Sequence, residues 1–391
     1  MAGGHDVVVA IPSYNCAHTI NYVVYQAAKG LATYFPEARP LILVSDGGST
    51  DGTREVVRAM RLPFKVDVAV EEYPGVKGKG SAIRYAFERA LEEGARVVVM
   101  LDSDLRSVTP EWVKLLGEPY WGRYDLITPL YVRHKYDATI TNHLAYPLTQ
   151  ALYGVDVRQP IGGDFGLSSS LIEELLKSPL WETEYVPRFG IDVFITNTAL
   201  AKGYKVAQAE LGVKVHEPKD PAAHLESMFR EVAGSQFSVA VEMAASWLRV
   251  RGVRETEVLK AGRVWRGAQP VEVCPELSLK KAKSSLKELR SKAVSVIGED
   301  LYREVLQSLE SLPGGEGVKD ELWAEVVYSH LLAFRSGEKK LVLSSLHACW
   351  LAKVATYLYE VADLSDEEAE RVIKREAKAF LLKKKYLVDN W

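Results

Sequence analysis

The stretch from Val97 to Leu105, VVVMLDSDL, limits the possible folds of this chain more than any other. Its four leading apolar residues are typical of a strand buried on both faces of a mostly parallel sheet. Two carboxylates, Asp102 and Asp104, follow at once. Ligands of open α/β sheets bind at the carboxyl ends of strands, and carboxylate oxygens suit a hard divalent cation that holds a diphosphate. The motif therefore predicts either a metal site for a nucleotide-linked substrate or an acidic turn after a core strand.

Three more apolar runs precede this one, at Val7–Ile11, Leu41–Val44 and Val66–Val70, and they alternate with segments of helical spacing. Such alternation predicts an α/β fold with a mostly parallel sheet and right-handed crossovers. The strands end in loops that read PSYN, SDGGSTDGT and GVKGKG. Simple turns do not require this many polar groups at consecutive strand ends, so we expect a ligand site along one edge of the sheet.

The chain has 391 residues, which exceeds the size at which a single core usually stops growing. From about residue 222 the pattern becomes helical to the end. We therefore expect an α/β domain over residues 1–221 and an all-helical domain over residues 222–391. The helical region is long and rich in tryptophan, which makes a homodimer through it one possibility.

Composition excludes several classes of function. The formal net charge of -3 gives no electrostatic reason to expect nucleic acid as a partner. The three cysteines are far apart, without a CxxC pair, which fits a reducing compartment. The N-terminal sequence does not resemble a signal peptide, and no apolar run approaches the roughly 18 residues of a membrane span. We expect a cytoplasmic protein without a membrane span.

Two phosphate-binding motifs are absent. The loop at 75–80 lacks the G-x-x-x-x-G-K-[ST] pattern, because Lys79 is followed by Gly80, and no G-x-G-x-x-G follows the first strand.

Four further features have both a structural and a functional interpretation. The polar stretch Arg133–Asn142 is either an exposed loop with a helix cap or a site for a small anion. The pair Gly162-Gly163 is a turn where backbone can approach a ligand. Asp192 opens an apolar helix, where the helix dipole alone favours it. His216 precedes a proline turn, and it is either a surface residue or a third metal ligand.

The order of these motifs resembles that of the GT-A-fold, nucleotide-sugar-dependent glycosyltransferases of the broad family-2-like group. The matching motifs are IPSYNCAHTI, SDGGSTDGT and LDSDL. The later motifs GKGSAIRYAF, DSDLRSVTPEW, RHKYDATITN, QPIGGDFGLSS, GIDVFITNTAL and KVHEP are similar to those of retaining synthases that place a sugar on glycerate or 3-phosphoglycerate. These are mannosylglycerate, glucosylglycerate and glucosyl-3-phosphoglycerate synthases. The resemblance covers about residues 7–218.

The resemblance implies a retaining, metal-dependent hexosyltransferase that makes a compatible solute from a GDP- or UDP-linked sugar and a small hydroxy acid. It implies Mg²⁺ or Mn²⁺ held by Asp102, Asp104 and His216, and catalytic roles for Asp104 and Asp192. The donor-binding residues that it implies are Pro12, Ser13, Tyr14, Asp46, Lys79, Asp102, Ser103, Gly163 and Asp164. The acceptor-binding residues that it implies are Arg133, Thr139, Asn142 and Gly162.

Some features depart from the family or leave alternatives open. The Q-x-x-R-W signature of processive relatives is absent, which argues against polymer synthesis, and Asp164 stands where several relatives have Glu. No residue is an obvious covalent nucleophile, so the resemblance implies front-face substitution. A lipid or glycan acceptor, a sugar-phosphate nucleotidyltransferase and a non-catalytic nucleotide-sugar-binding module are the alternatives. The sequence does not choose the sugar, the base or the phosphorylation state of the acceptor.

Overall fold

The computed structural model describes residues 4–216, 221–262 and 267–391, and it divides into two compact units. The sheet unit takes the described residues of 1–132, 157–221 and 255–269. The helical unit takes those of 133–156, 222–254 and 270–391. A boundary at 221/222 therefore exists, as proposed from the sequence, but the chain also crosses between the units at two other segments. Residues 133–156 belong to the helical unit, and residues 255–269 belong to the sheet unit.

The sheet unit is built on an eight-stranded sheet in the order β10-β8-β5-β7-β4-β1-β2-β3. All neighbours are parallel except β7, which is antiparallel to both β4 and β5. This arrangement confirms the predicted mostly parallel α/β fold with a helical C-terminal region. The strands are β1 (Val7–Ser13), β2 (Pro40–Asp46), β3 (Asp67–Glu72), β4 (Val97–Met100), β5 (Leu126–Val132), β7 (Gly166–Ser168), β8 (Val206–Val213) and β10 (Val258–Leu259).

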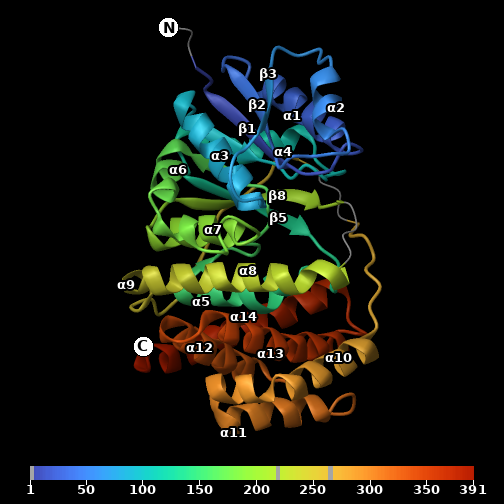
Figure 1. Cartoon of the computed structure of the whole chain (residues 1–391), viewed down its shortest axis with the longest axis vertical. Helices are drawn as coiled ribbons and strands as arrows, with labels where there is room; N and C mark the ends of the chain where they lie inside the picture. The colour runs from blue at the N-terminus through green and yellow to red at the C-terminus, as the bar shows by residue number, and fades with distance from the viewer. Residues whose placement is uncertain (1–3, 217–220, 263–266) are drawn as a thin grey trace. The chain divides into compact units, whose positions relative to one another are not determined.

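Helices cover both faces of this sheet (Figure 1). On one face, α1 (Ile20–Tyr34) packs beside α4 (Pro110–Leu116), and both share a buried core with alternate residues of β1 such as Val7 and Val9. On the other face, α3 (Lys79–Glu92) packs on β1 and β2 and beside α6 (Ser169–Leu176). Buried apolar residues recur along α1 at helical spacing, which is why this segment forms an amphipathic helix rather than another strand. The remaining helical elements of this unit are α2 (Thr53–Ala59), η1 (Glu118–Trp121), η3 (Pro179–Glu182) and α7 (Ile191–Ala201).

One strand differs from the sequence-based expectation. The pattern predicts two closing strands, Lys205–Ala209 and Gly212–Val215, but the structure has the single strand β8. The pairing of β5 with β8 shifts by one residue, from Leu130 opposite Glu210 to Tyr131 opposite Gly212. Gly212 has a φ of 78°, so it absorbs a β-bulge that lets the strand continue.

The helical unit contains a π-helical turn, η2 (Thr141–Ala145), and a set of α-helices packed around buried aromatic residues such as Trp323 and Tyr357. The α-helices are α5 (Tyr146–Tyr153), α8 (Pro221–Glu242), α9 (Ala244–Trp247), α10 (Pro275–Glu288), α11 (Arg290–Glu310), α12 (Asp320–Ser336), α13 (Lys339–Glu360) and α14 (Asp366–Asp389). Two-residue strands, β6 (Val155–Asp156) and β9 (Arg254–Glu255), form a second, two-stranded sheet.

Helix α13 has the length and apolar composition that could cross a membrane. However, 83% of its most apolar window is buried inside the protein, and the core helix of a globular protein passes the same test. Its apolar character is explained by packing, since its neighbours include α10, α11 and α12.

Candidate active site

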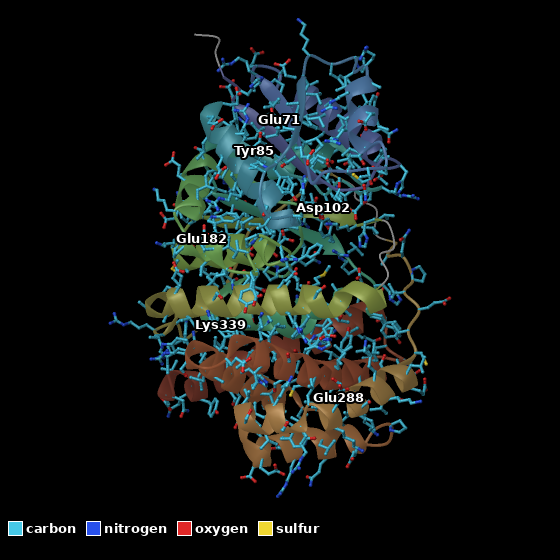
Figure 2. All side chains as sticks on the ribbon, viewed as in Figure 1. Glu71, Tyr85, Asp102, Glu182, Glu288 and Lys339 are labelled. Carbon is cyan, nitrogen blue, oxygen red and sulfur yellow. The ribbon has the colours of Figure 1, made fainter. Side chains whose placement is uncertain are left out.

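The carboxyl ends of β1, β2 and β4 lie side by side, because β1 pairs in parallel with both of the others. Ser13 is directly opposite Asp46 at the ends of β1 and β2. Asp102 follows β4 by two residues, and its position is marked in Figure 2. Tyr14, which follows β1, has 65% of its surface exposed. This edge therefore presents an exposed aromatic ring and the DSD turn on neighbouring strand ends.

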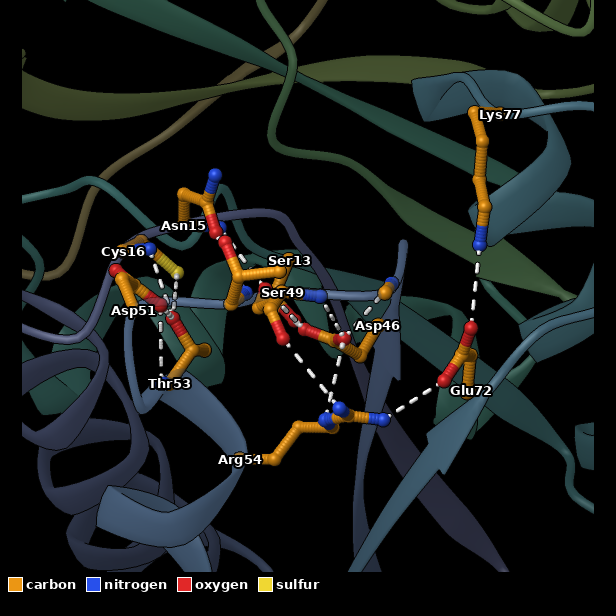
Figure 3. Close-up of polar contacts among 12 residues, drawn as sticks. Ser13, Asn15, Cys16, Asp46, Ser49, Asp51, Thr53, Arg54, Glu72 and Lys77 are labelled. Carbon is orange, nitrogen blue, oxygen red and sulfur yellow. Dashed lines mark hydrogen bonds and ion pairs between the residues drawn. The ribbon is translucent and has the colours of Figure 1, made fainter.

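Asp46 organises the loop that follows β2 (Figure 3). The side chain is fully buried. Its Oδ1 accepts hydrogen bonds from Gly48 N at 2.9 Å and Ser49 N at 2.7 Å, and its Oδ2 accepts from Ser13 Oγ at 2.7 Å and Ser49 Oγ at 2.6 Å. Burial favours the neutral acid, but these hydrogen bonds outweigh it and keep the pKa of Asp46 below its ordinary value. Asp46 thus fixes the shape of the loop, while its direct contact with a nucleoside remains a prediction.

The loop after β1 is held to the loop after β2 by further hydrogen bonds. Asn15 donates from its backbone N to Ser49 Oγ, and its Oδ1 accepts from Thr50 N, both at 2.9 Å. Asn15 has a φ of 49°, a left-handed conformation that asparagine tolerates better than most residues. The two loops therefore form one rigid surface beside Tyr14.

A cluster of lysine and aspartate side chains lies at the DSD turn. Lys79 Nζ is 2.9 Å from Asp102 Oδ1 and 3.1 Å from Asp192 Oδ2. Lys214 Nζ is 2.7 Å from Asp102 Oδ2 and 2.7 Å from Asp164 Oδ2. Each ammonium group thus bridges Asp102 to a second carboxylate. Only 13% of the Lys79 side chain and 6% of the Lys214 side chain are exposed.

The three carboxylates of this cluster have pKa values that are shifted in different directions by their surroundings. Burial favours the neutral form of Asp102, but Lys214 and Lys79 outweigh it and hold the pKa of Asp102 well below its ordinary value. Burial raises the pKa of Asp164 and of Asp192, and their lysine partners offset only part of that effect. Asp192 Oδ1 is buried and has no hydrogen-bond partner among the described residues. Asp102 is therefore the fixed anion of the cluster, and Asp192 keeps one oxygen available.

Asp164 is fully buried, and its carboxylate holds neighbouring segments of this edge together. Its Oδ1 accepts a hydrogen bond from Asp102 N at 2.8 Å, and its Oδ2 accepts one from the Tyr131 hydroxyl. It therefore connects the turn after β4 to β5, and direct contact of its carboxylate with the sugar remains a prediction.

Two glycines allow backbone to approach the cluster. Gly163 has a φ of 93°, and a Cβ there would lie 2.6 Å from Asp102 Oδ2 and within 3.2 Å of both lysine ammonium groups. At Gly80 a Cβ would lie 1.9 Å from Val186 O. Gly80 thus lets the first turn of α3 press against the loop before α7, and this contact keeps Lys79 next to Asp192. The predicted backbone approach at Gly162-Gly163 is directed at the cluster, since Gly162 O accepts a hydrogen bond from Lys214 Nζ at 2.9 Å.

Asp104 and His216 are brought to the same turn from distant parts of the sequence. Leu105 and His216 form an isolated antiparallel bridge, and Arg106 N donates to Val215 O at 2.8 Å. In the part of the chain that the structure describes, no group of three His, Cys, Asp or Glu side chains is arranged to hold a metal. The carboxylate is nevertheless an oxygen donor of the kind that suits Mn²⁺ or Mg²⁺, and the imidazole on the adjoining segment adds a nitrogen donor. The third predicted ligand, Asp102, has both oxygens engaged by lysines.

Ser103, between the two carboxylates, is buried, and its backbone O accepts a hydrogen bond from Thr19 Oγ1 at 2.9 Å. The turn is thereby tied to the start of α1.

The predicted acceptor residues Arg133, Thr139 and Asn142 lie on one segment of the helical unit. Arg133 Nη1 is 2.8 Å from Asp137 Oδ2, and Asn142 Nδ2 donates to Asp137 O at 3.0 Å. Asp137 thus organises the segment. The roles of the three residues toward an acceptor remain predictions.

The sequence analysis missed Lys214 and Tyr131. Lys214 is two residues before His216, and strand geometry places residues two apart on one face, so the spacing could have suggested it. Tyr131 lies within β5 and gave no signal, because an aromatic residue in a strand is usually a core residue.

Comparisons with known proteins found similar sequences and structures. The model of the family described as Glycosyl transferase family 2 matches residues 8–175. Among curated proteins, the chain is 34% identical over 119 residues to Glycosyltransferase AglJ and 30% identical over 128 residues to Glycosyltransferase AglD, both from Haloferax volcanii. These alignments cover 30% and 32% of this chain, and they span 34% of AglJ and 20% of AglD.

Solved structures of glucosyl-3-phosphoglycerate synthase from Mycobacterium tuberculosis are also similar. A complex with phosphoglyceric acid has a TM-score of 0.48 at 26% identity, covering 60% of this chain and 80% of that one. A complex with Mn²⁺, uridine diphosphate and phosphoglyceric acid has a TM-score of 0.48 at 25% identity, covering 60% and 78%. The match to the glycosyl transferase family 2 model thus covers residues 8–175, which include Lys79 and Asp102, whereas Lys214 and His216 lie beyond it.

Proposed function

We propose that this chain is a metal-dependent hexosyltransferase that moves a glucose or mannose from a GDP- or UDP-sugar to D-glycerate or 3-phospho-D-glycerate. One observation carries the proposal. In a sheet unit whose residues 8–175 match the family 2 model, two buried lysines lie against Asp102, beside a turn where Leu105, next to Asp104, pairs with His216. A diphosphate is the ligand that such a mixed edge of ammonium, carboxylate and imidazole groups suits best.

The donor would occupy the edge formed by the ends of β1, β2 and β4. The exposed ring of Tyr14, with Pro12 and Ser13, offers a surface for the nucleoside. Lys79 and Lys214 are the charges that can offset the negative charge developing on the leaving diphosphate. Both lysines already have carboxylate partners. They therefore stand preorganised before the donor binds, and no large side-chain movement is needed.

We assign the metal to Asp104 and His216, and we assign Asp102 to the two lysines. Mn²⁺ or Mg²⁺ bound there would stabilise the departing diphosphate. Asp102 can then act through Lys79 and Lys214, because its carboxylate fixes both ammonium groups within 3 Å.

The transfer would form a bond between an acceptor hydroxyl oxygen and the anomeric carbon while the bond from that carbon to the phosphate oxygen breaks. The hydroxyl proton passes to the departing diphosphate. We place the free Oδ1 of Asp192 beside the reacting sugar, since Asp192 is fixed by Lys79 and keeps one oxygen without a partner among the described residues. Attack from the face that the diphosphate leaves would retain the configuration of the sugar.

The direct test is release of nucleoside diphosphate by the purified full chain. GDP- and UDP-linked glucose and mannose are each offered with D-glycerate or 3-phospho-D-glycerate, with Mn²⁺ or with a chelator. We expect acceptor-dependent release from one donor and loss of release with the chelator. Tight donor binding without release would instead support a non-catalytic binding module, and no glycerate-dependent release from any donor would refute the proposal.

Two variants test whether the activity depends on the lysines at this edge of the sheet. Lys79→Met removes one ammonium group, and we expect kcat to fall by about 10²-fold, as for loss of one preorganised electrostatic contact. Arg123→Met is the matched control, because Arg123 precedes β5 at the opposite edge of the sheet and pairs with the exposed Glu257. It should retain wild-type kcat. Equal losses in the two variants would contradict the site assignment.

A further inference from the structure

The segment Arg133–Ala145 has an unusual backbone at two places. Ala138 has a φ of 58°, a left-handed conformation that costs a residue with a side chain of order 1 kcal/mol. Three residues later the chain forms the π-helical turn Thr141–Ala145, a rare element that is frequent at functional sites. A backbone of this kind persists only where its surroundings hold it.

The first anchor of this segment is Lys135. Its ammonium group donates all three hydrogen bonds to carbonyls just beyond the end of α13, at 2.9 Å to Val361 O, 2.8 Å to Ala362 O and 2.7 Å to Leu364 O. Lys135 N donates to Asp366 Oδ1 at 2.8 Å, and Lys135 O accepts from the Tyr357 hydroxyl at 2.8 Å. Five hydrogen bonds thus fix one residue of the segment to the turn between α13 and α14.

The second anchor is His143, within the π-helical turn. Its side chain is completely buried, and Nδ1 donates to Glu376 Oε2 of α14 at 2.9 Å. Its backbone O accepts from Trp323 Nε1 of α12 at 2.7 Å. Glu376 is in turn 3.5 Å from Lys353 Nζ of α13, which is paired with Asp320 at 2.6 Å. Three C-terminal helices therefore contribute to this anchor.

We propose that helices α12–α14 are the scaffold that shapes the acceptor-binding segment, with Lys135 as a positioning residue. This inference rests on the proposed function, because it takes Arg133, Thr139 and Asn142 as acceptor contacts. Lys135 and His143 lie on either side of Ala138, so the strained residue, Thr139 and Asn142 are held between them. The helical unit then serves substrate recognition, and its stability and the affinity for the acceptor are linked.

The test separates the KM of the acceptor from the KM of the donor. Lys135→Met removes the three charged donors and keeps the unbranched, apolar stem of the side chain. We expect the acceptor KM, measured with D-glycerate and with 3-phospho-D-glycerate, to rise at least about tenfold. Each of the three lost hydrogen bonds comes from a charged group and contributes to holding the segment in its binding conformation. The donor KM should stay within about twofold.

Two further variants keep the test decisive. Asp366→Ala removes the bond to Lys135 N at an exposed position, and we expect the acceptor KM to rise about threefold in a protein that still folds. Lys287→Met is the matched control, because the same substitution there removes an ammonium group of α10, outside α12–α14, that lies 3.8 Å from Glu310 Oε1 of α11. It should leave both KM values within about twofold.

The outcomes distinguish this inference from the function on which it rests. If the wild-type protein shows no glycerate-dependent release, the proposed function fails. If the wild type is active and neither Lys135→Met nor Asp366→Ala changes the acceptor KM, the scaffold role is refuted. Parallel rises in donor and acceptor KM, or an equal effect of Lys287→Met, would show a general loss of structure and refute it too. Should Lys135→Met not fold, Asp366→Ala decides.

Discussion

A single methyl group at Gly163 should damage the lysine–aspartate cluster more than it damages the fold. Gly163→Ala places a side chain on a residue with a φ of 93°, and the left-handed backbone alone costs about 1–2 kcal/mol. The new Cβ would also lie 2.6 Å from Asp102 Oδ2. To reach ordinary contact near 3.4 Å, that oxygen must move by about 0.8 Å, which disturbs its 2.7 Å contact with the ammonium group of Lys214. Misplacement of about 1 Å in a preorganised site can lower activity about 10²-fold.

The control is Gly94→Ala, since Gly94 has a φ of 76° and a Cβ there would meet nothing within 4 Å. Urea denaturation should show a loss of free energy of unfolding of about 1–2 kcal/mol in Gly94→Ala, which bears the backbone cost alone, and at least as large a loss in Gly163→Ala, which adds the contact with Asp102. Steady-state diphosphate release should fall about 10²-fold only in Gly163→Ala. Activity of Gly163→Ala within threefold of Gly94→Ala would refute the claim that close backbone approach positions the cluster.

Three further predictions concern stability. Ser13→Ala removes one donor to the buried Asp46 and should lower the free energy of unfolding by about 1–3 kcal/mol in urea; a change within about 0.5 kcal/mol would contradict the role of Asp46 in the loop. Burial lowers the pKa of His5, but Asp67 and Glu93, bonded to its two ring nitrogens, outweigh it and raise the pKa above 6.5. The contribution of His5 to the free energy of unfolding is therefore fully present below about pH 6.5 and is lost as the pH rises through the raised pKa. The stability difference between wild type and His5→Gln should shrink from pH 6 to pH 8, and a constant difference would contradict this prediction. Burial, with a smaller effect of Arg251, lowers the pKa of Lys384 to about 7. Because the unfolded chain then binds more protons, the stability of the wild type relative to Lys384→Met should rise between about pH 7 and pH 10.4; a flat profile would contradict the shifted pKa.

The fold was largely predictable because the buried strands are short, continuous apolar runs. Val97–Met100 was predicted as a strand and is one over the same residues. The prediction of two closing strands was wrong at β8. Gly212 suggests a break between two strands in the sequence, but in the structure it accommodates a bulge opposite Tyr131. The sequence also showed no sign of β7, since three residues that pair antiparallel between β4 and β5 carry too little pattern. The segments that cross between the two units have no compositional boundary.

The site was predictable as a set of carboxylates on one edge, but not as a network. The sequence marks Asp102 and Asp104 equally, whereas the structure gives Asp102 two lysine partners and places Asp104 beside the strand pairing of His216. That distinction depends on Lys214, which reaches Asp102 only after β8 has joined the sheet. Likewise, the resemblance implies a nucleoside contact for Asp46, which stays a prediction, and the structure adds that this buried carboxylate fixes the shape of the loop after β2. Pairing between distant strands of this kind produces no pattern in the local sequence.

The bridge between Leu105 and His216 joins parts of the chain that are more than a hundred residues apart. A ligand that requires both Asp104 and His216 can therefore bind only after β8 has paired with β5, and not to a chain in which the sheet is incomplete. Its binding free energy adds to the stability of the completed sheet by mass action. Under the proposed function, supply of the nucleotide donor would thus also slow proteolysis of the folded protein.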